Sequence, residues 1–210
     1  LWQILNEEFF DGEVGENKPL IFSNLINGGA HAKNNLDIQE YMVVVKTKNS
    51  CKESIKKLKD FYAGLGDFLK KEFNIDELNF GDEGGYSLKF PGNFEPVSVL
   101  AKLIRKSGLA ADFSLALDAA ANNFYDKRRY NFGGDSLAAA QMAGIYKTYF
   151  GAEPLLISIE DPFAESDFAG FKKLQSAIGD KLVVGDDLTT TDPASINKAV
   201  RKKLISGVII

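Results

Sequence analysis

The stretch that most constrains this 210-residue sequence is residues 155–165, which read LLISIEDPFAE. It begins as a short apolar run of β-prone residues, a pattern typical of a strand buried on both faces. The run stops at Glu160-Asp161-Pro162, where proline removes a backbone donor and ends the strand. Acidic side chains at the tip of a buried strand do not serve core packing, so this stretch predicts a functional edge of a sheet.

Two further apolar runs lead into acidic residues in the same way. Asp118 ends the run 114–118, and Asp186 follows the run 182–185. Strands and helices are expected to alternate through the second half of the chain. We expect strands at 114–118, 155–159, 181–185 and 207–210 and helices at 136–150, 167–178 and 193–203. Such alternation predicts an α/β fold with a parallel sheet. In a parallel α/β barrel the C-terminal strand ends share one face, so we expect these acids to gather there.

The first half of the chain predicts a different start to the sheet. Strands are expected at 20–25 and 38–45, and the short loop between them favours antiparallel pairing, because a parallel crossover needs a dozen or more residues. Apolar residues at helical spacing predict an amphipathic helix at 52–73. A second helix is expected at 95–106.

We expect two segments of unequal size. Residues 1–19 mix aromatic and acidic residues with glycines and a proline, which predicts a linker or the remnant of an N-terminal region. Residues 20–210 are expected to form one domain, since a chain of this length with 45% hydrophobic residues can bury a core. Residues 207–210 have the pattern of a buried strand with no turn after them, so we expect a part of a longer barrel.

Composition narrows the possible partners. A net charge of −4 and an isoelectric point near 5.2 give no whole-chain electrostatic case for binding nucleic acid or an anionic membrane. No apolar run is long enough to span a bilayer. The single cysteine, Cys51, excludes an intrachain disulfide and fits a reducing compartment.

Asp118, Glu160 and Asp186 are the candidate metal ligands. Carboxylate oxygens suit a hard divalent ion, and Mg²⁺ is the obvious candidate. No histidine or cysteine accompanies them, which argues against zinc. One acid after a strand is commonly a helix cap or a solvated loop residue, but three on successive strands favour a metal site.

Three other polar residues allow two interpretations each. Glu83, beside Asp82 and among glycines, is a candidate general acid or base whose pKa a neighbouring charge and partial burial would raise, although the same residues form plain turns. Glu40 lies in an apolar strand and either faces solvent or borders the site. His31, the only histidine, either contacts a polar ligand from a mobile loop or is an ordinary surface residue.

Taken together, these stretches resemble the enolase (phosphopyruvate hydratase) family. The resemblance covers nearly the whole chain, in family order, and its motifs are residues 24–32 (NLINGGAHA), 39–42 (QEYM), 81–85 (GDEGG), 117–120 (LDAA), 158–165 (SIEDPFAE) and 185–189 (GDDLT). The last two motifs together are highly specific. The implied fold is an incomplete enolase-type TIM barrel, with the first two strands antiparallel and βα units after them.

The resemblance also implies roles for individual residues. Asp118, Glu160 and Asp186 match the magnesium ligands of the family, and Glu83 matches its proton donor. Glu40 and Gln39 match residues that line the substrate site, which Glu160 and Asp186 also border. His31 lies on the flexible loop that closes over the substrate.

The implied activity is the reversible dehydration of 2-phosphoglycerate to phosphoenolpyruvate in glycolysis. The family is magnesium-dependent and forms homodimers or larger rings, and the implied location is cytoplasmic, with an additional cell-surface or secreted pool. The alternative is a non-catalytic, enolase-like binding protein or surface receptor. Retention of Glu83 and of the three proposed metal ligands weighs against a purely structural role.

The sequence also departs from the family pattern. Ala30 replaces a small alcohol before the loop histidine, Asn122-Asn123 replaces a pair of small and acidic residues, and residues 86–90 are atypical. We expect the N-terminal α+β domain and the last barrel strands to be missing. The lysine base of the family would follow residues 207–210, so we expect no turnover from these 210 residues alone.

Overall fold

The computed structural model of the chain describes residues 2–9, 19–48 and 50–210. Eight strands form one mixed sheet in the order β11-β10-β9-β5-β2-β1-β4-β3. These strands are β1 (Leu20–Asn27), β2 (Glu40–Lys46), β3 (Asn79–Phe80), β4 (Tyr86–Ser87), β5 (Phe113–Asp118), β9 (Leu156–Glu160), β10 (Leu182–Gly185) and β11 (Gly207–Val208). The α-helices are α1 (Trp2–Phe9), α2 (Cys51–Phe73), α3 (Glu95–Lys106), α4 (Ala139–Ala152), α5 (Phe168–Gln175) and α6 (Pro193–Arg201).

The sheet has the expected pairing. β1 and β2 are antiparallel, β2 and β5 are antiparallel, and β5, β9, β10 and β11 follow one another in parallel. Within the described residues β11 and β3 are the two ends of the sheet and do not pair with each other, so the sheet is open. The predicted α/β fold of an incomplete barrel, with an antiparallel start followed by βα units, is confirmed.

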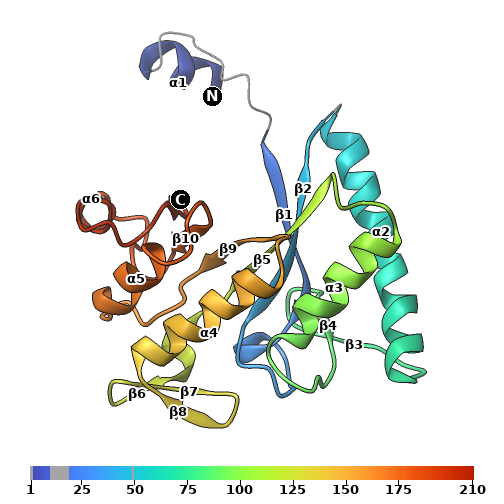
Figure 1. Cartoon of the computed structure of the whole chain (residues 1–210). Coiled ribbons are helices and arrows are strands. Elements are labelled where there is room, and N and C mark those ends of the chain that lie inside the picture. The colour runs from blue at the N-terminus through green and yellow to red at the C-terminus, as the bar shows by residue number, and fades with distance from the viewer. Residues whose placement is uncertain (1, 10–18, 49) are drawn as a thin grey trace.

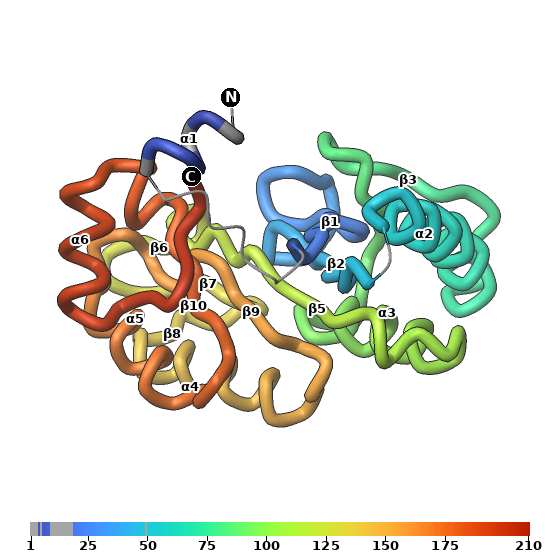
Figure 2. Tube along the Cα trace, turned by 90° about the horizontal axis from the view of Figure 1, so that it is seen from above, coloured from blue at the N-terminus to red at the C-terminus, as the bar shows by residue number. Residues whose placement is uncertain are grey.

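Helices cover the outer side of this curved sheet (Figure 1). Seen from above, the central strands form an arc, and α2, α3, α4 and α5 follow one another along it (Figure 2). The amphipathic helix α2 buries Phe61, Leu65 and Leu69, and full burial of such a side chain stabilises by about 1.5–3 kcal/mol. Its ends are capped by Ser50, which accepts from the Glu53 amide, and by Asn74 in the left-handed region.

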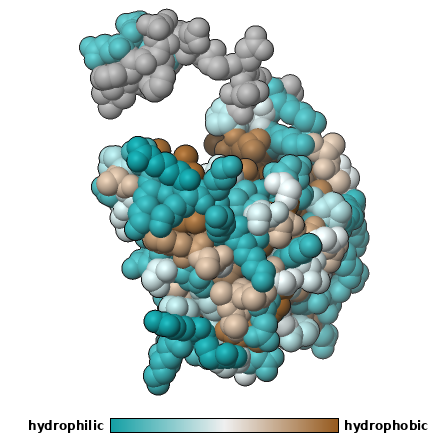
Figure 3. All heavy atoms as spheres, turned by 60° about the vertical axis from the view of Figure 1, so that its left-hand side comes forward, coloured by the Kyte–Doolittle hydropathy of each residue, from teal (hydrophilic) through white to brown (hydrophobic). Residues whose placement is uncertain are grey.

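On the side that carries α5 and α6, hydrophilic residues cover much of the surface and apolar residues lie between them (Figure 3). None of the described helices is both long enough and apolar enough to cross a bilayer.

Several expected boundaries were wrong. The helix expected at 136–150 begins only at Ala139, because residues 135–137 are a strand, β8 (Asp135–Leu137). This strand pairs with β7 (Arg129–Phe132), which pairs with β6 (Tyr125–Asp126) in a second sheet that the sequence reading missed. The strand expected at 207–210 ends at Val208. Within the segment 1–19, expected to be a linker or the remnant of an N-terminal region, residues 2–9 form α1, and residues 10–18 lie outside the described residues.

A bidentate ion pair connects the C-terminal end of α3 to the segment between α4 and β9. Arg105 Nη1 lies 2.9 Å from Glu153 Oε2, and Arg105 Nη2 lies 2.5 Å from Glu153 Oε1. The Glu153 side chain is only 7% exposed, so without its partner it becomes a buried, unpaired charge.

We therefore expect Arg105→Met to lower the free energy of unfolding by about 2–3 kcal/mol, less than for a fully buried pair because the Arg105 side chain is half exposed. Chemical denaturation measures this loss. Lys56→Met, which removes an exposed i,i+4 pair with Asp60, is the control and should cost roughly 0.3–0.5 kcal/mol. Equal losses from both variants would contradict the role given to burial.

Candidate active site

One row of polar residues crosses the sheet at a single edge. The strand register pairs Asn27 with Glu40, Glu40 with Asp118, and Asp118 with Glu160. Asp186 directly follows β10, which neighbours β9. Because the antiparallel strand β2 begins where its neighbours end, its first residue joins the C-terminal ends of the parallel strands. The structure therefore places the predicted acids along the same edge.

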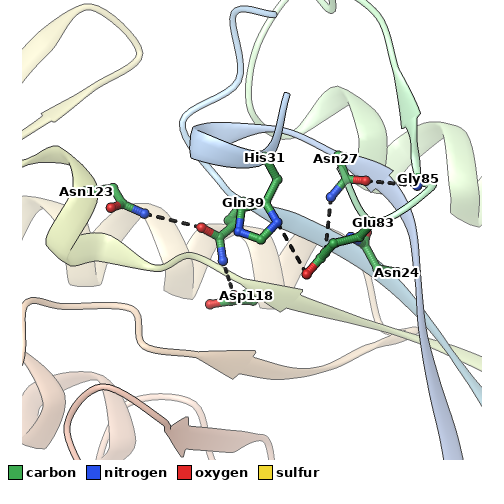
Figure 4. Close-up of polar contacts among 8 residues, drawn as sticks. All are labelled: Asn24, Asn27, His31, Gln39, Glu83, Gly85, Asp118 and Asn123. Carbon is green, nitrogen blue, oxygen red and sulfur yellow. Dashed lines mark hydrogen bonds and ion pairs between the residues drawn. The ribbon is translucent and has the colours of Figure 1, made fainter. Parts of the chain in front are cut away.

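Asp118 is held at this edge by two hydrogen-bond donors. Gln39 Nε2 donates to Asp118 Oδ2 over 3.0 Å, and the Ala120 amide donates to Asp118 Oδ1 over 2.9 Å. Asn123 Nδ2 in turn donates to Gln39 Oε1 over 3.3 Å, as Figure 4 shows. Gln39, expected to line the substrate site, is thus bonded directly to a predicted metal ligand.

Burial and mutual repulsion raise the pKa values of these acids. Burial is the main cause that raises the pKa of Glu160 to about 8, and the nearby carboxylates of Asp118, Asp161, Asp186 and Glu40 add to it. Burial likewise raises the pKa of Asp118 to about 7, partly offset by the Ala120 amide and Gln39. No lysine or arginine is among the charged groups that shift either pKa. Such a cluster favours a bound cation.

Asp161 is a site residue that the sequence reading did not single out. Its side chain accepts from the amides of Asp186 (3.2 Å) and Asp187 (2.7 Å), and its backbone lies in the left-handed region at φ 35°. Burial raises the pKa of Asp161 to about 6, although these two amides favour the charged form. Asp161 therefore orients the segment that carries Asp186. Its position directly after Glu160 was the available signal.

Glu83 projects from the loop between β3 and β4 into a cluster of polar side chains. Glu83 Oε2 accepts from Asn24 Nδ2 over 2.8 Å and from Asn27 Nδ2 over 3.3 Å. His31 Nδ1 lies 3.3 Å from Glu83 Oε1, and Figure 4 shows these groups facing one another. Asn24 and Asn27 stand in the 24–32 motif, but no pattern along the chain joins them to Glu83.

Glu40 and Glu83 share a hydrogen bond, and their pKa values move apart. Burial, the bond to Glu83 and the charge of Asp118 raise the pKa of Glu40 to about 8. The pKa of Glu83 is lowered, against the effect of its partial burial, because Glu40, Asn24, Asn27 and His31 all favour the ionised form. The expectation that the pKa of Glu83 is raised was therefore wrong. In this pair the environment thus favours the protonated form of Glu40 and the ionised form of Glu83.

The structure brings some of the predicted residues closer together than others. Among the described residues, the side chains of His31, Glu40 and Glu83 have ligand atoms within 4.8 Å of one another. The carboxylates of Asp118, Glu160 and Asp186 do not meet that limit as a set. Asp118 ends β5 and Asp186 follows β10, and these strands lie on either side of β9, so the two backbones lie about 10 Å apart or more.

One known protein family matches nearly the whole chain. Residues 17–210 match the family model described as "Enolase, C-terminal TIM barrel domain". The chain belongs to the enolase family. The open sheet is thus part of an enolase-type barrel.

Curated relatives support the same assignment. The chain is 36% identical over 207 residues to an enolase of Methanopyrus kandleri, covering 96% of this chain and 48% of that protein. It is 38% identical over 206 residues to an enolase of Anaplasma marginale, covering 97% and 47%. It is 35% identical over 197 residues to an enolase of Corynebacterium kroppenstedtii, covering 91% and 45%. The chain spans about half the length of these enolases.

Proposed function

We propose that this chain provides the acidic part of an enolase active site, which dehydrates 2-phosphoglycerate reversibly to phosphoenolpyruvate in glycolysis. The observation that carries the proposal is the row of carboxylates Glu40, Asp118 and Glu160 at one sheet edge, with raised pKa values and no cationic side chain among their causes. A core-packing role does not account for such a row.

We propose Mg²⁺ as the cofactor, held by Asp118, Glu160 and Asp186. Their donor set consists of oxygen atoms, which a hard divalent ion prefers. Repulsion from neighbouring carboxylates contributes to the raised pKa values of Asp118 and Glu160, and a cation relieves that repulsion. When bound, the ion supplies positive charge that stabilises the second negative charge on the substrate carboxylate after the adjacent carbon loses its proton.

The Glu40–Glu83 pair is the proposed proton donor. The reaction removes a proton from C2 and breaks the C3–oxygen bond, so the leaving hydroxide must receive a proton to depart as water. Glu40 holds a proton up to a pH of about 8 and is hydrogen-bonded to Glu83, which allows Glu83 to deliver that proton at the exposed end of the pair. We propose that His31 and Gln39, which contact Glu83 and Asp118 respectively, line the substrate site.

The acids named so far include a proposed proton donor but no proposed base. No lysine is among the groups that shift the pKa of Glu40, Asp118 or Glu160, whereas the resemblance implies a lysine base after residues 207–210. The intact enzyme is proposed to be a homo-oligomer that works in the cytoplasm.

A chimera tests the proposal. This chain replaces the aligned segment of the Anaplasma marginale enolase, over which the two are 38% identical across 206 residues. Phosphoenolpyruvate formation from 2-phosphoglycerate is followed by ultraviolet absorbance with and without Mg²⁺. We expect magnesium-dependent turnover, because Asp118, Glu160 and Asp186 match the metal-ligand positions that the family resemblance implies.

Two controls make the result decisive. The Asp118→Asn chimera should lose turnover by at least about 100-fold, since it removes a proposed ligand charge without changing side-chain size. Cooperative thermal unfolding establishes that each chimera is folded. A folded chimera without turnover, beside an active parent enolase, would sink the proposed function.

A further inference from the structure

The loop that carries Glu83 has little structure of its own. It joins β3 to β4, which pair through only Asn79–Ser87 and Phe80–Tyr86. Two backbone hydrogen bonds close it, from the Gly81 amide to the Gly85 carbonyl (2.8 Å) and from the Gly84 amide to the Gly81 carbonyl (3.1 Å). A hairpin this short is not stable by itself. The position of Glu83 therefore depends on what packs against residues 81–85.

On the inner side the loop rests on Asn27, which is fully buried. Asn27 Oδ1 accepts from the Gly85 amide over 2.9 Å, and Asn27 Nδ2 donates to Glu83 Oε2 over 3.3 Å. Added Cβ atoms on Gly81 and Gly85 would lie 2.5 and 2.4 Å from Asn27 atoms. The two glycines thus allow the loop to lie directly on the amide of Asn27.

On the outer side two tyrosines hold the loop. Tyr62, from α2, donates its hydroxyl to the Gly84 carbonyl over 2.5 Å. The rings of Tyr62 and Tyr86 are stacked, with centroids 4.6 Å apart and planes 16° from parallel. Tyr86 donates its hydroxyl to the Tyr62 carbonyl over 3.1 Å, and a Cβ on Gly66 would lie 2.5 Å from that hydroxyl. We call the Tyr62–Tyr86 pair, seated on Gly66, the tyrosine clamp.

We propose that Tyr62 and Tyr86 are positioning residues that press the 81–85 loop against Asn27 and thereby orient the Glu83 carboxylate. Tyr62 of the clamp donates a hydrogen bond to the carbonyl of Gly84, the residue next to Glu83. It acts on His31 as well, because the Asp82 amide donates to the His31 carbonyl over 3.0 Å. The inference rests on the proposed function of Glu83 as the group that delivers the proton. Small displacements of such a group cost large factors in rate.

Amide hydrogen exchange of the 210-residue chain tests the clamp without requiring turnover. Tyr62→Phe keeps the stacked ring and removes only the hydroxyl, so we expect the amides of Gly84 and Gly85 to exchange about tenfold faster. Tyr125→Phe is the matched control, since no hydrogen bond of its hydroxyl is found among the described residues. Its exchange in the 81–85 loop should equal that of the unaltered chain.

A second pair of variants lies on α2 itself. Gly66→Ala places a methyl group against the Tyr86 hydroxyl, whereas Gly64→Ala has nothing within 4 Å of the new atom. Alanine is the better helix former at both positions. We expect Gly66→Ala to speed exchange in the loop and Gly64→Ala to leave it unchanged, which separates the clamp from any general effect on α2.

The ionisation of Glu83 distinguishes positioning from simple packing. Its pKa, followed by the ¹³C shift of the labelled carboxyl group, should rise toward the ordinary glutamate value in Tyr62→Phe, because a looser loop weakens the bonds from Asn24 and Asn27. Faster exchange with an unchanged Glu83 pKa would overturn the positioning role, and unchanged exchange in both Tyr62→Phe and Gly66→Ala would overturn the clamp. Neither result depends on whether the chimera turns over.

Discussion

The free energy of unfolding of this chain should fall as the pH rises from about 5 to about 8 when no divalent cation is added. Asp118, Glu160 and Glu40 all contribute, and Asp118 illustrates the effect. Burial raises its pKa from 3.8 to about 7 in the folded chain. Above pH 3.8 the unfolded chain releases this proton while the folded chain keeps it, so rising pH favours unfolding until the folded group ionises as well. A pKa difference of this size corresponds to roughly 4 kcal/mol.

Urea denaturation across this pH range, with and without Mg²⁺, measures the effect. Saturating Mg²⁺ should restore stability at the upper end of the range, because it binds the ionised acids of the folded chain. Potassium chloride at equal ionic strength should not, since screening alone does not relieve buried repulsion.

The Asp118→Asn variant should be more stable than the unaltered chain at pH 8 and should respond less to Mg²⁺. The exposed Asp180→Asn variant serves as the control. A flat pH profile in the unaltered chain would contradict the raised pKa values on which the metal site is argued.

Glu83→Gln should lower turnover of the chimera by roughly 10²- to 10⁴-fold, the usual contribution of a positioned general acid. Glutamine keeps the size of the side chain and its contacts with Asn24 and Asn27, but it cannot pass on a proton. Steady-state kinetics at saturating substrate and Mg²⁺ measure the loss. The magnesium affinity should stay unchanged, since Glu83 is not a proposed ligand.

Asp82→Asn is the matched control, because Asp82 is the adjacent, exposed carboxylate of the same loop, and it should keep most of the turnover. Turnover of the unaltered chimera should also fall as the pH rises through about 8, where Glu40 loses its proton. Equal effects of Glu83→Gln and Asp82→Asn would remove Glu83 from the proposed proton path.

The sequence did not predict which of Glu40 and Glu83 has the raised pKa. The sequence places Asp82 next to Glu83, which suggests a raised pKa, but the folded chain surrounds Glu83 with hydrogen-bond donors and lowers it. The raised pKa belongs to Glu40, which is partly buried and faces Glu83. Burial and hydrogen-bond donors from distant parts of the chain determine the pKa values of Glu40 and Glu83. Neither effect can be predicted from the residues next to them in the sequence.

Local patterns were sufficient for the architecture. Apolar runs that stop at Asp118, at Glu160-Asp161-Pro162 and before Asp186 predict buried parallel strands with acids at one edge, because strand length, period and termination are local properties. The short loop between β1 and β2 likewise predicted their antiparallel pairing. These features specify the family and the edge of the sheet that carries the site.

Tertiary structure decided how that edge is assembled. Asn24 and Glu83 are 59 residues apart in the chain, and Tyr62 and Gly84 are 22 apart, so only packing of α2 and β1 around the loop brings them together. The hairpin strands β6, β7 and β8 also escaped prediction, because each of them is only two to four residues long. Which groups meet, and which of them keeps a proton, depends on burial and long-range contacts that form only when the sheet folds.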